Sequence, residues 1–200
     1  MGTTASGTGA AGPQSYLMQV IESRRSVRAF ADKPVDRSLL AECVEAVRFA
    51  PSACNVQPWR FLAVDDPGLR DRLAQAAFSG IYKATRFAAD APVLIVLLTR
   101  FDWFVQGAGR QIQGTQYHLL DAGIAGEHFV LRAAELGLGT CWIGWYNRRK
   151  VRKILFMPRR YRLCAMIALG WPEEEFTPKE KSRREFEELM SFNKVGFSEK

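Results

Sequence analysis

The sequence predicts an α+β domain in which a central β-sheet is flanked by helices. Amphipathic helical patterns and β-rich apolar runs are mixed along the chain without strict alternation. The run 93–99 after Pro92 is continuous, apolar and β-branched, which is typical of a central strand buried on both faces. A length of 200 residues suits one compact domain, which we expect over residues 14–200.

Apolar periodicity and cap residues divide the chain into its expected elements. Asp36, Asp66 and Asn147 are the expected N-caps of three helices, and Pro67 suits the first position of the second. Helices are expected over residues 14–23, 38–49, 67–78, 119–136, 148–156 and 184–190. Strands are expected over residues 60–64, 93–99, 140–145 and 163–169.

The expected helix over 119–136 contains two glycines, Gly123 and Gly126. Each interior glycine costs about 1 kcal/mol of helix stability relative to alanine. We therefore expect these positions to allow close approach of another helix, either in the core or in a dimer interface.

Composition and charge exclude several classes of protein. No apolar run approaches the roughly 20 residues needed to span a bilayer, so no membrane partner is expected. Residues 1–13 lack a charged start and an apolar core, which predicts a disordered N-terminal tail rather than a signal peptide. The cysteines have no CxxC spacing, so we expect reduced thiols, no metal site and a cytoplasmic protein.

The formal charge of +7 is unevenly distributed along the chain. Eight basic residues and no acidic one lie between Arg148 and Arg162. No RNP, zinc-finger or KH pattern accompanies this run, so we expect no nucleic-acid partner. A solvated face or a site for phosphorylated small molecules explains the run better.

A first candidate site is the run Arg24-Arg25-Ser26-Val27-Arg28. Three arginines and a serine in five residues cannot all be buried in a core. Guanidinium groups and a hydroxyl are the groups that hold a phosphate through several charge-assisted hydrogen bonds. The alternative is a solvated helix end, where cations favour the C-terminal dipole.

A second candidate site is the stretch from Pro51 to Trp59, which we call the elbow. Its prolines bracket small and amide residues, so the backbone is neither regular helix nor sheet ladder. A stiff polar connection between two core elements is a place where a ligand or a partner chain binds. A capped helix-to-strand turn is the equally favoured alternative.

Further along, residues 100–116 have no clear period and carry Trp103 and Phe104 near two glycines. Such a segment suits either a mobile cover over a pocket or a packed loop.

Four separated motifs occur in one order along the chain. They are Arg24 to Arg28, the elbow, Gly137-Leu138-Gly139-Thr140-Cys141-Trp142-Ile143-Gly144, and Leu169-Gly170-Trp171-Pro172 followed by Lys181-Ser182-Arg183. Together they resemble the FMN-dependent nitroreductase family over almost the whole chain, from about Tyr16 to Asn193.

The resemblance implies a nitroreductase-like fold with a central mixed β-sheet, assembled as an intertwined homodimer with FMN at the subunit interface. The elbow would reach the FMN of the other subunit, and the late lysine and arginine would join the first motif on the phosphate. Tyr82, Lys83, Thr85 and Arg86 are candidates for a contact with the flavin ring. The residues that the resemblance assigns to FMN are Arg24, Arg25, Ser26, Arg28, Pro51, Ser52, Ala53, Asn55, Gln57, Trp142, Ile143, Gly144, Lys181 and Arg183.

The implied activity is reduction of nitroaromatic, quinone or related small-molecule acceptors by NADH or NADPH in a ping-pong reaction. The flavin N5 is then the reactive centre, and Arg28 stabilises the negative charge that hydride transfer leaves on the ring. Trp103, Phe104 and Trp142 would shape the acceptor pocket. The alternatives are another branch of the fold, which remodels flavin or removes halogen, and a flavin-binding protein without turnover.

Overall fold

The computed structural model describes residues 15–100, 115–173 and 182–196. The expected N-terminal tail at 1–13 lies outside the described residues, as do Trp103, Phe104 and Lys181. No helix within the described ranges is long and apolar enough to span a membrane.

One four-stranded antiparallel sheet forms the centre of the molecule. Its strands are β1 (Trp59–Val64), β2 (Val93–Arg100), β3 (Gly139–Ile143) and β4 (Tyr161–Gly170), in the order β1-β2-β4-β3. Each neighbouring pair runs antiparallel. The expectation of a mixed sheet was therefore wrong for these strands. A single isolated bridge, between Ser26 and Thr140, is the parallel pairing in the described part of the chain.

Three helices begin where their cap residues predicted. Asp36 accepts the Ser38 N–H at 2.7 Å, Asp66 accepts the Leu69 N–H at 2.7 Å, and Asn147 accepts the Lys150 N–H at 3.0 Å. The α-helices are α1 (Tyr16–Ser23), α2 (Arg37–Arg48), α3 (Pro67–Ala77), α5 (Tyr117–Glu135), α6 (Arg148–Ile154) and α7 (Phe186–Leu189). Two 3₁₀ segments, η1 (Ala53–Asn55) and η2 (Gly80–Asp90), were not predicted.

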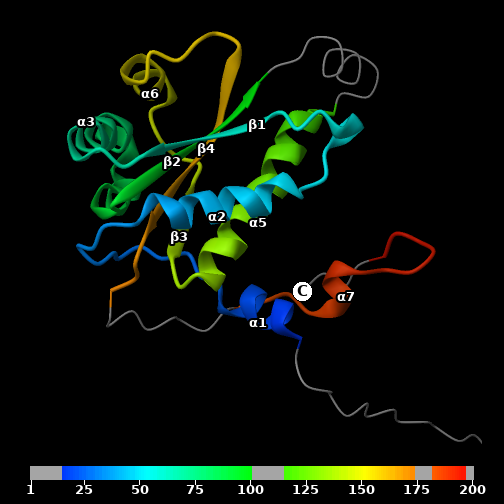
Figure 1. Ribbon diagram of the computed structural model, residues 1–200. Coiled ribbons are helices and arrows are strands. Elements are labelled where there is room, and N and C mark those ends of the chain that lie inside the picture. Colours follow the sequence, from blue (N-terminus) through cyan, green and yellow to red (C-terminus); the bar gives the residue numbers. More distant parts are fainter. Residues whose placement is uncertain (1–14, 101–114, 174–181, 197–200) are drawn as a thin grey trace, which may run out of the picture.

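Helices cover both faces of the sheet (Figure 1). Successive side chains of β2 point to opposite faces, as the strand period requires. Leu94, Val96 and Leu98 pack on the side of α3, η2 and α6, while Val93, Ile95 and Leu97 pack on the side of α2 and α5. The central strand is buried on both faces as predicted, although its neighbours run antiparallel.

Gly126 allows a close approach, but its neighbour is not a helix. A Cβ at this position would overlap the indole ring of Trp142 on β3. The expectation of helix-to-helix contact was wrong here, because α5 lies directly on the sheet and an aromatic ring fills the gap. At Gly123 a Cβ would meet no other atom of the chain within 4 Å.

Substitution of Gly126 by valine should therefore destabilise the fold. The new side chain collides with the Trp142 ring, and overpacking of this kind costs about 1–3 kcal/mol. Gly68 on α3 is the matched control, because a Cβ there meets its nearest neighbour at an ordinary 3.5 Å. Urea unfolding should show a lower midpoint for Gly126→Val and little change for Gly68→Val. Equal midpoints for the two variants would contradict the packing described.

Candidate functional site

A cavity of about 350 Å³ opens beside the start of β3. Three segments line it: the stretch after α1, the turn from α5 into β3, and the stretch after β4. The lining residues are Ser23, Arg24, Arg25, Val27, Ala134, Gly137, Leu138, Gly139, Thr140, Pro172 and Glu173. Three of the four sequence motifs thus meet at one place.

The first motif is attached to β3 by backbone contacts. Ser26 bridges Thr140, and the Val27 N–H donates to the Thr140 carbonyl oxygen at 2.9 Å. This attachment requires glycine at position 139, because a Cβ there would lie 2.8–2.9 Å from the Val27 side chain. Gly139 therefore leaves the space that Val27 of the first motif occupies.

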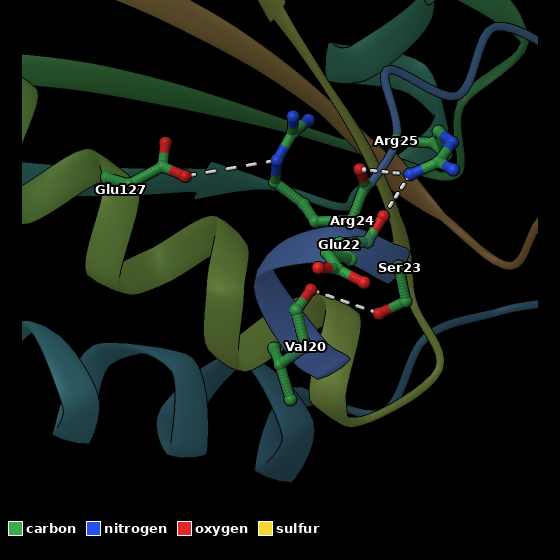
Figure 2. Close-up of polar contacts among 6 residues, drawn as sticks. All are labelled: Val20, Glu22, Ser23, Arg24, Arg25 and Glu127. Atoms are coloured by element: carbon green, nitrogen blue, oxygen red, sulfur yellow. Dashed lines mark hydrogen bonds and ion pairs between the residues drawn. The ribbon is translucent and has the colours of Figure 1, made fainter. Parts of the chain in front are cut away.

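The two arginines at the end of α1 have different surroundings (Figure 2). Arg24 points towards α5, where its Nε lies 3.9 Å from a carboxylate oxygen of Glu127. The Arg25 guanidinium folds back and donates to the carbonyl oxygens of Glu22 and Arg24, which satisfies the C-terminal end of the helix. The Nε of Arg25 is buried and has no hydrogen-bond partner among the described residues.

These surroundings fit an anionic group. Both arginines line the cavity, and the unpartnered Nε is a buried donor that an incoming acceptor would satisfy. The ion pair of Arg24 is 22% exposed on the arginine and 50% on the glutamate. Because so exposed a pair contributes only about 0–1 kcal/mol, a phosphate can displace Glu127 readily.

Arg28 lies exposed beyond the attached segment. Its guanidinium donates to the Ser26 carbonyl oxygen at 3.3 Å, and its Cζ lies 5.6 Å from the centre of the Phe87 ring. Phe87 belongs to η2 and packs against the core on the α3 side. The cation is therefore held at the surface by a carbonyl and an aromatic face. Phe87 was missed because nothing in the sequence pairs it with Arg28.

Gly144 follows β3 in open space, where a Cβ would meet no atom within 4 Å. The next residue, Trp145, donates from its indole N–H to the Ile81 carbonyl oxygen at 3.1 Å. The Thr85 hydroxyl donates to the Trp145 carbonyl oxygen at 2.9 Å, and the Tyr82 ring lies 5.1 Å from the indole. Of the four candidates in η2, Tyr82 and Thr85 thus contact Trp145, the residue after Gly144, whereas Lys83 and Arg86 line a cavity next to α3.

The elbow is strained and is tied to α5. Cys54, Asn55 and Gln57 have left-handed backbones, with φ angles of 51°, 53° and 48°. Such conformations cost about 1–3 kcal/mol each in residues other than glycine and cluster at functional sites. The Ala53 N–H donates to the carboxylate of Asp121 on α5 at 3.0 Å, and that acid is only 5% exposed.

Side-chain contacts complete the elbow. The Gln57 N–H donates to the Ser52 hydroxyl oxygen at 2.9 Å, and the Gln57 amide donates to the Asn55 side-chain oxygen at 2.9 Å. Pro51, Asn55 and Gln57 remain exposed. No elbow residue lines the cavity at β3. The exposed polar side chains of the elbow thus lie outside the cavity at β3 of their own chain.

The remaining predicted residues take other positions. The Trp142 side chain lies against Gly126 of α5, and Ile143 is buried on the α3 side of the sheet. Arg183 is exposed, and its guanidinium donates to the Ser182 carbonyl oxygen at 2.9 Å. It does not line the cavity, so its expected place beside Arg24 stays a prediction.

The thiols show no sign of nucleophilic chemistry. Cys43 and Cys141 are buried, Cys164 is half-buried, and Cys54 is exposed in the elbow. Burial raises the pKa of Cys43 to about 12, and it also raises the pKa of Cys141 and Cys164, so these groups stay protonated at neutral pH. No metal-ligating cluster of acids, histidines and cysteines occurs among the described residues.

The chain belongs to the nitroreductase family, whose model matches residues 21–171. An NADH dehydrogenase of Thermus thermophilus is 32% identical over 184 residues, with 79% of this chain and 87% of that protein covered. A 5,6-dimethylbenzimidazole synthase of Rhodospirillum rubrum is 28% identical and covers 84% of this chain and 87% of its own length. An FMN-dependent nitroreductase of Clostridium difficile R20291 superposes with a TM-score of 0.71 at 26% identity, covering 89% of this chain and 99% of that structure.

The family, the α+β fold class and the enzyme class, an oxidoreductase, are thereby confirmed. Asp121, like Phe87, is a residue that sequence reasoning missed. The sequence does indicate it, because Asp121 is the single acid within the apolar pattern of residues 119–125. An unpaired acid on the buried side of a helix requires a hydrogen-bonding partner.

Replacement of Asp121 by alanine should loosen the elbow. The Ala53 N–H would lose its acceptor, and an unsatisfied buried donor costs about 1–3 kcal/mol. Asparagine at the same position keeps a carbonyl oxygen and should restore most of the protection of the Ala53 amide against hydrogen exchange. Hydrogen exchange of the Ala53 amide measures this directly, with faster exchange expected in Asp121→Ala than in Asp121→Asn. An amide as well protected in the alanine variant as in the parent protein would refute the role of Asp121.

Proposed function

We propose that the protein is a homodimeric FMN-dependent oxidoreductase that takes hydride from NADH or NADPH and passes it to small-molecule acceptors. Nitroaromatics and quinones are the acceptor class, and reductant and acceptor use one pocket in turn. The observation that carries the proposal is the cavity at β3, where two arginines and a buried unpartnered donor suit the phosphate of FMN. The family membership and the FMN-dependent relative support the same cofactor.

The phosphate end of FMN would be held by Arg24, Arg25 and Ser26, with Lys181 and Arg183 from the late motif. Arg24 would exchange its weak pair with Glu127 for a doubly charged phosphate. Charge-assisted hydrogen bonds of guanidinium to phosphate contribute about 1.5–3 kcal/mol each, which exceeds an exposed ion pair.

The flavin ring would lie along β3 towards its end. Gly144 lies four residue steps after Thr140, which corresponds to about 13 Å of extended strand. Gly144 leaves space for a flat ring and would offer its backbone N–H to the flavin, and Ile143 and Trp142 precede it on the strand. Arg28 supplies a positive charge near the ring, held in place by Phe87 and the Ser26 carbonyl. When bound, FMN supplies the two-electron redox chemistry that no side chain of the protein provides.

The elbow residues Pro51, Ser52, Ala53, Asn55 and Gln57 would contact the FMN of the partner subunit. Within one chain the elbow leads into β1, at the opposite edge of the sheet from β3. Three interstrand spacings of about 4.8 Å separate these edges. This separation supports an elbow contributed by a second subunit to a flavin beside β3.

Exposed apolar side chains support the dimer. None of the residues of α1 is buried, although Tyr16 and Leu17 are among them. Phe49 after α2 is 77% exposed, and Leu120 on α5 is 56% exposed. Apolar surface concentrated on adjacent helices marks an interaction site, and a second copy of the chain would bury it.

A flavin-remodelling enzyme is the second candidate, because the 5,6-dimethylbenzimidazole synthase covers most of the chain at 28% identity. The two functions differ in the fate of the flavin. Under aerobic turnover with NADPH, a nitroreductase leaves bound FMN intact, whereas the remodelling branch consumes it. Product analysis by chromatography distinguishes the two.

The phosphate assignment predicts the behaviour of a double variant, Arg24→Gln with Arg183→Gln. Loss of two charge-assisted contacts should weaken FMN binding by about 100-fold, so the protein should purify largely without flavin. The control, Arg149→Gln with Arg159→Gln, removes the same charge from exposed positions elsewhere. FMN content is measured from flavin absorbance after denaturation. A full FMN complement in the first variant would remove Arg24 and Arg183 from the phosphate site.

The activity itself is tested by anaerobic mixing of the FMN-loaded protein with NADH or NADPH. Hydride transfer should bleach the flavin absorbance, and an added quinone or nitroaromatic should restore it. A yellow protein that neither nucleotide bleaches is a flavin-binding protein without turnover. A protein that never retains FMN would overturn the cofactor assignment as well.

A further inference from the structure

Helices α3 and α6 lie on the other side of the sheet from α2 and α5 (Figure 1). A second groove opens between α3 and α6. Its cavity measures about 730 Å³, which is within the range of small-molecule sites. None of its lining residues belongs to the cavity at β3. The lining residues are Arg72, Gln75, Ala76, Ser79, Lys150, Lys153, Ile154 and Phe156.

The groove is positively charged. Arg72, Lys150 and Lys153 are exposed, no acidic residue lines the groove with them, and none of the three forms a salt bridge within the described residues. The neighbouring cavity shares Gln75 and Ser79 and adds two further cations, Lys83 and Arg86, against one acid, Asp71, which pairs with Arg70. A surface with one sign of charge attracts ligands of the opposite sign.

Phe156 stands at the edge of this groove, at a helix end whose geometry calls for a left-handed residue. Its N–H donates to the Lys153 carbonyl oxygen and the Met157 N–H donates to the Arg152 carbonyl oxygen, which is the Schellman motif at the end of α6. The residue has a left-handed backbone with φ of 45°, where glycine is usual, and it is 91% exposed. A bulky residue is strained there and gains no packing in return.

We propose that the groove between α3 and α6 binds a nucleotide, with the base stacked on Phe156 and the phosphates held by Arg72, Lys150 and Lys153. An exposed aromatic ring is a stacking platform for any base. Three unpaired cations beside it provide charge-assisted hydrogen bonds to phosphate oxygens. This site shares no lining residue with the cavity at β3 and goes beyond the proposed redox function. It also gives a role to the basic run after Asn147, which the flavin site leaves unused.

The first test uses Phe156→Gly in protein saturated with FMN, so that the flavin cavity is filled. Isothermal titration calorimetry with ADP should show binding to the parent protein and a loss of about fivefold or more in the variant, because the stacking surface is gone. The same variant should melt about 2–4 °C higher, because glycine adopts the left-handed backbone without strain. Weaker binding in a more stable protein cannot arise from misfolding.

The second test addresses charge. Lys150→Gln with Lys153→Gln should lower ADP affinity by about tenfold or more. Arg149→Gln with Arg159→Gln removes the same net charge at exposed positions outside the groove and should change affinity less than about twofold. Arg24→Gln should leave ADP affinity unchanged, because Arg24 lines the cavity at β3 and not the groove.

Three outcomes would overturn the proposal. The parent protein could fail to bind ADP at millimolar concentration. The two double variants could lose ADP affinity equally, which would mean that net charge alone, and not the groove, attracts ADP. Inorganic tripolyphosphate could bind as tightly as ADP and with no dependence on Phe156, which would remove the base from recognition.

Discussion

The order of the strands places the two parts of the candidate site on opposite edges of one sheet. The elbow leads into β1, and the arginine motif is attached to β3, with β2 and β4 between them. The helix α5 fixes this separation, since Asp121 near its start holds Ala53 while Ala134 near its end lines the cavity. These two residues are about 20 Å apart at the helical rise of 1.5 Å per residue. The length of α5 keeps the two parts of one chain apart, which supports a second subunit as part of the proposed site.

Gly139, the elbow and Phe156 each have a local feature that sets the position of a group and adds no packing. Gly139 gives up a side chain so that Val27 can lie against β3. The elbow keeps three left-handed residues, and a buried carboxylate satisfies its backbone. Phe156 combines a left-handed backbone with an exposed aromatic ring at the end of α6. Strain that is maintained without a packing gain points to a surface that meets a ligand.

Local signals allowed the sequence to predict most of the fold. The caps Asp36, Asp66 and Asn147 act through neighbouring backbone groups, so their helices began where expected. Contacts between distant segments could not be predicted in this way. The hydrogen bond between Ala53 and Asp121 joins residues 68 positions apart, and the overlap of Gly126 with Trp142 depends on how α5 lies on the sheet. The direction of strand pairing was wrong for the same reason, because an apolar run does not reveal the direction of its neighbours.

The shared site is tested most directly by subunit complementation. One subunit carries Arg24→Gln with Arg183→Gln, the other carries Ser52→Ala with Asn55→Ala, and two affinity tags isolate the heterodimer. If the arginines and the elbow of one site come from different chains, the heterodimer contains one intact site and one doubly defective site. It should then bind one FMN and recover NAD(P)H oxidation that neither parent homodimer shows. A heterodimer as empty and inactive as its parents would contradict the account, because each site would then be built from a single chain.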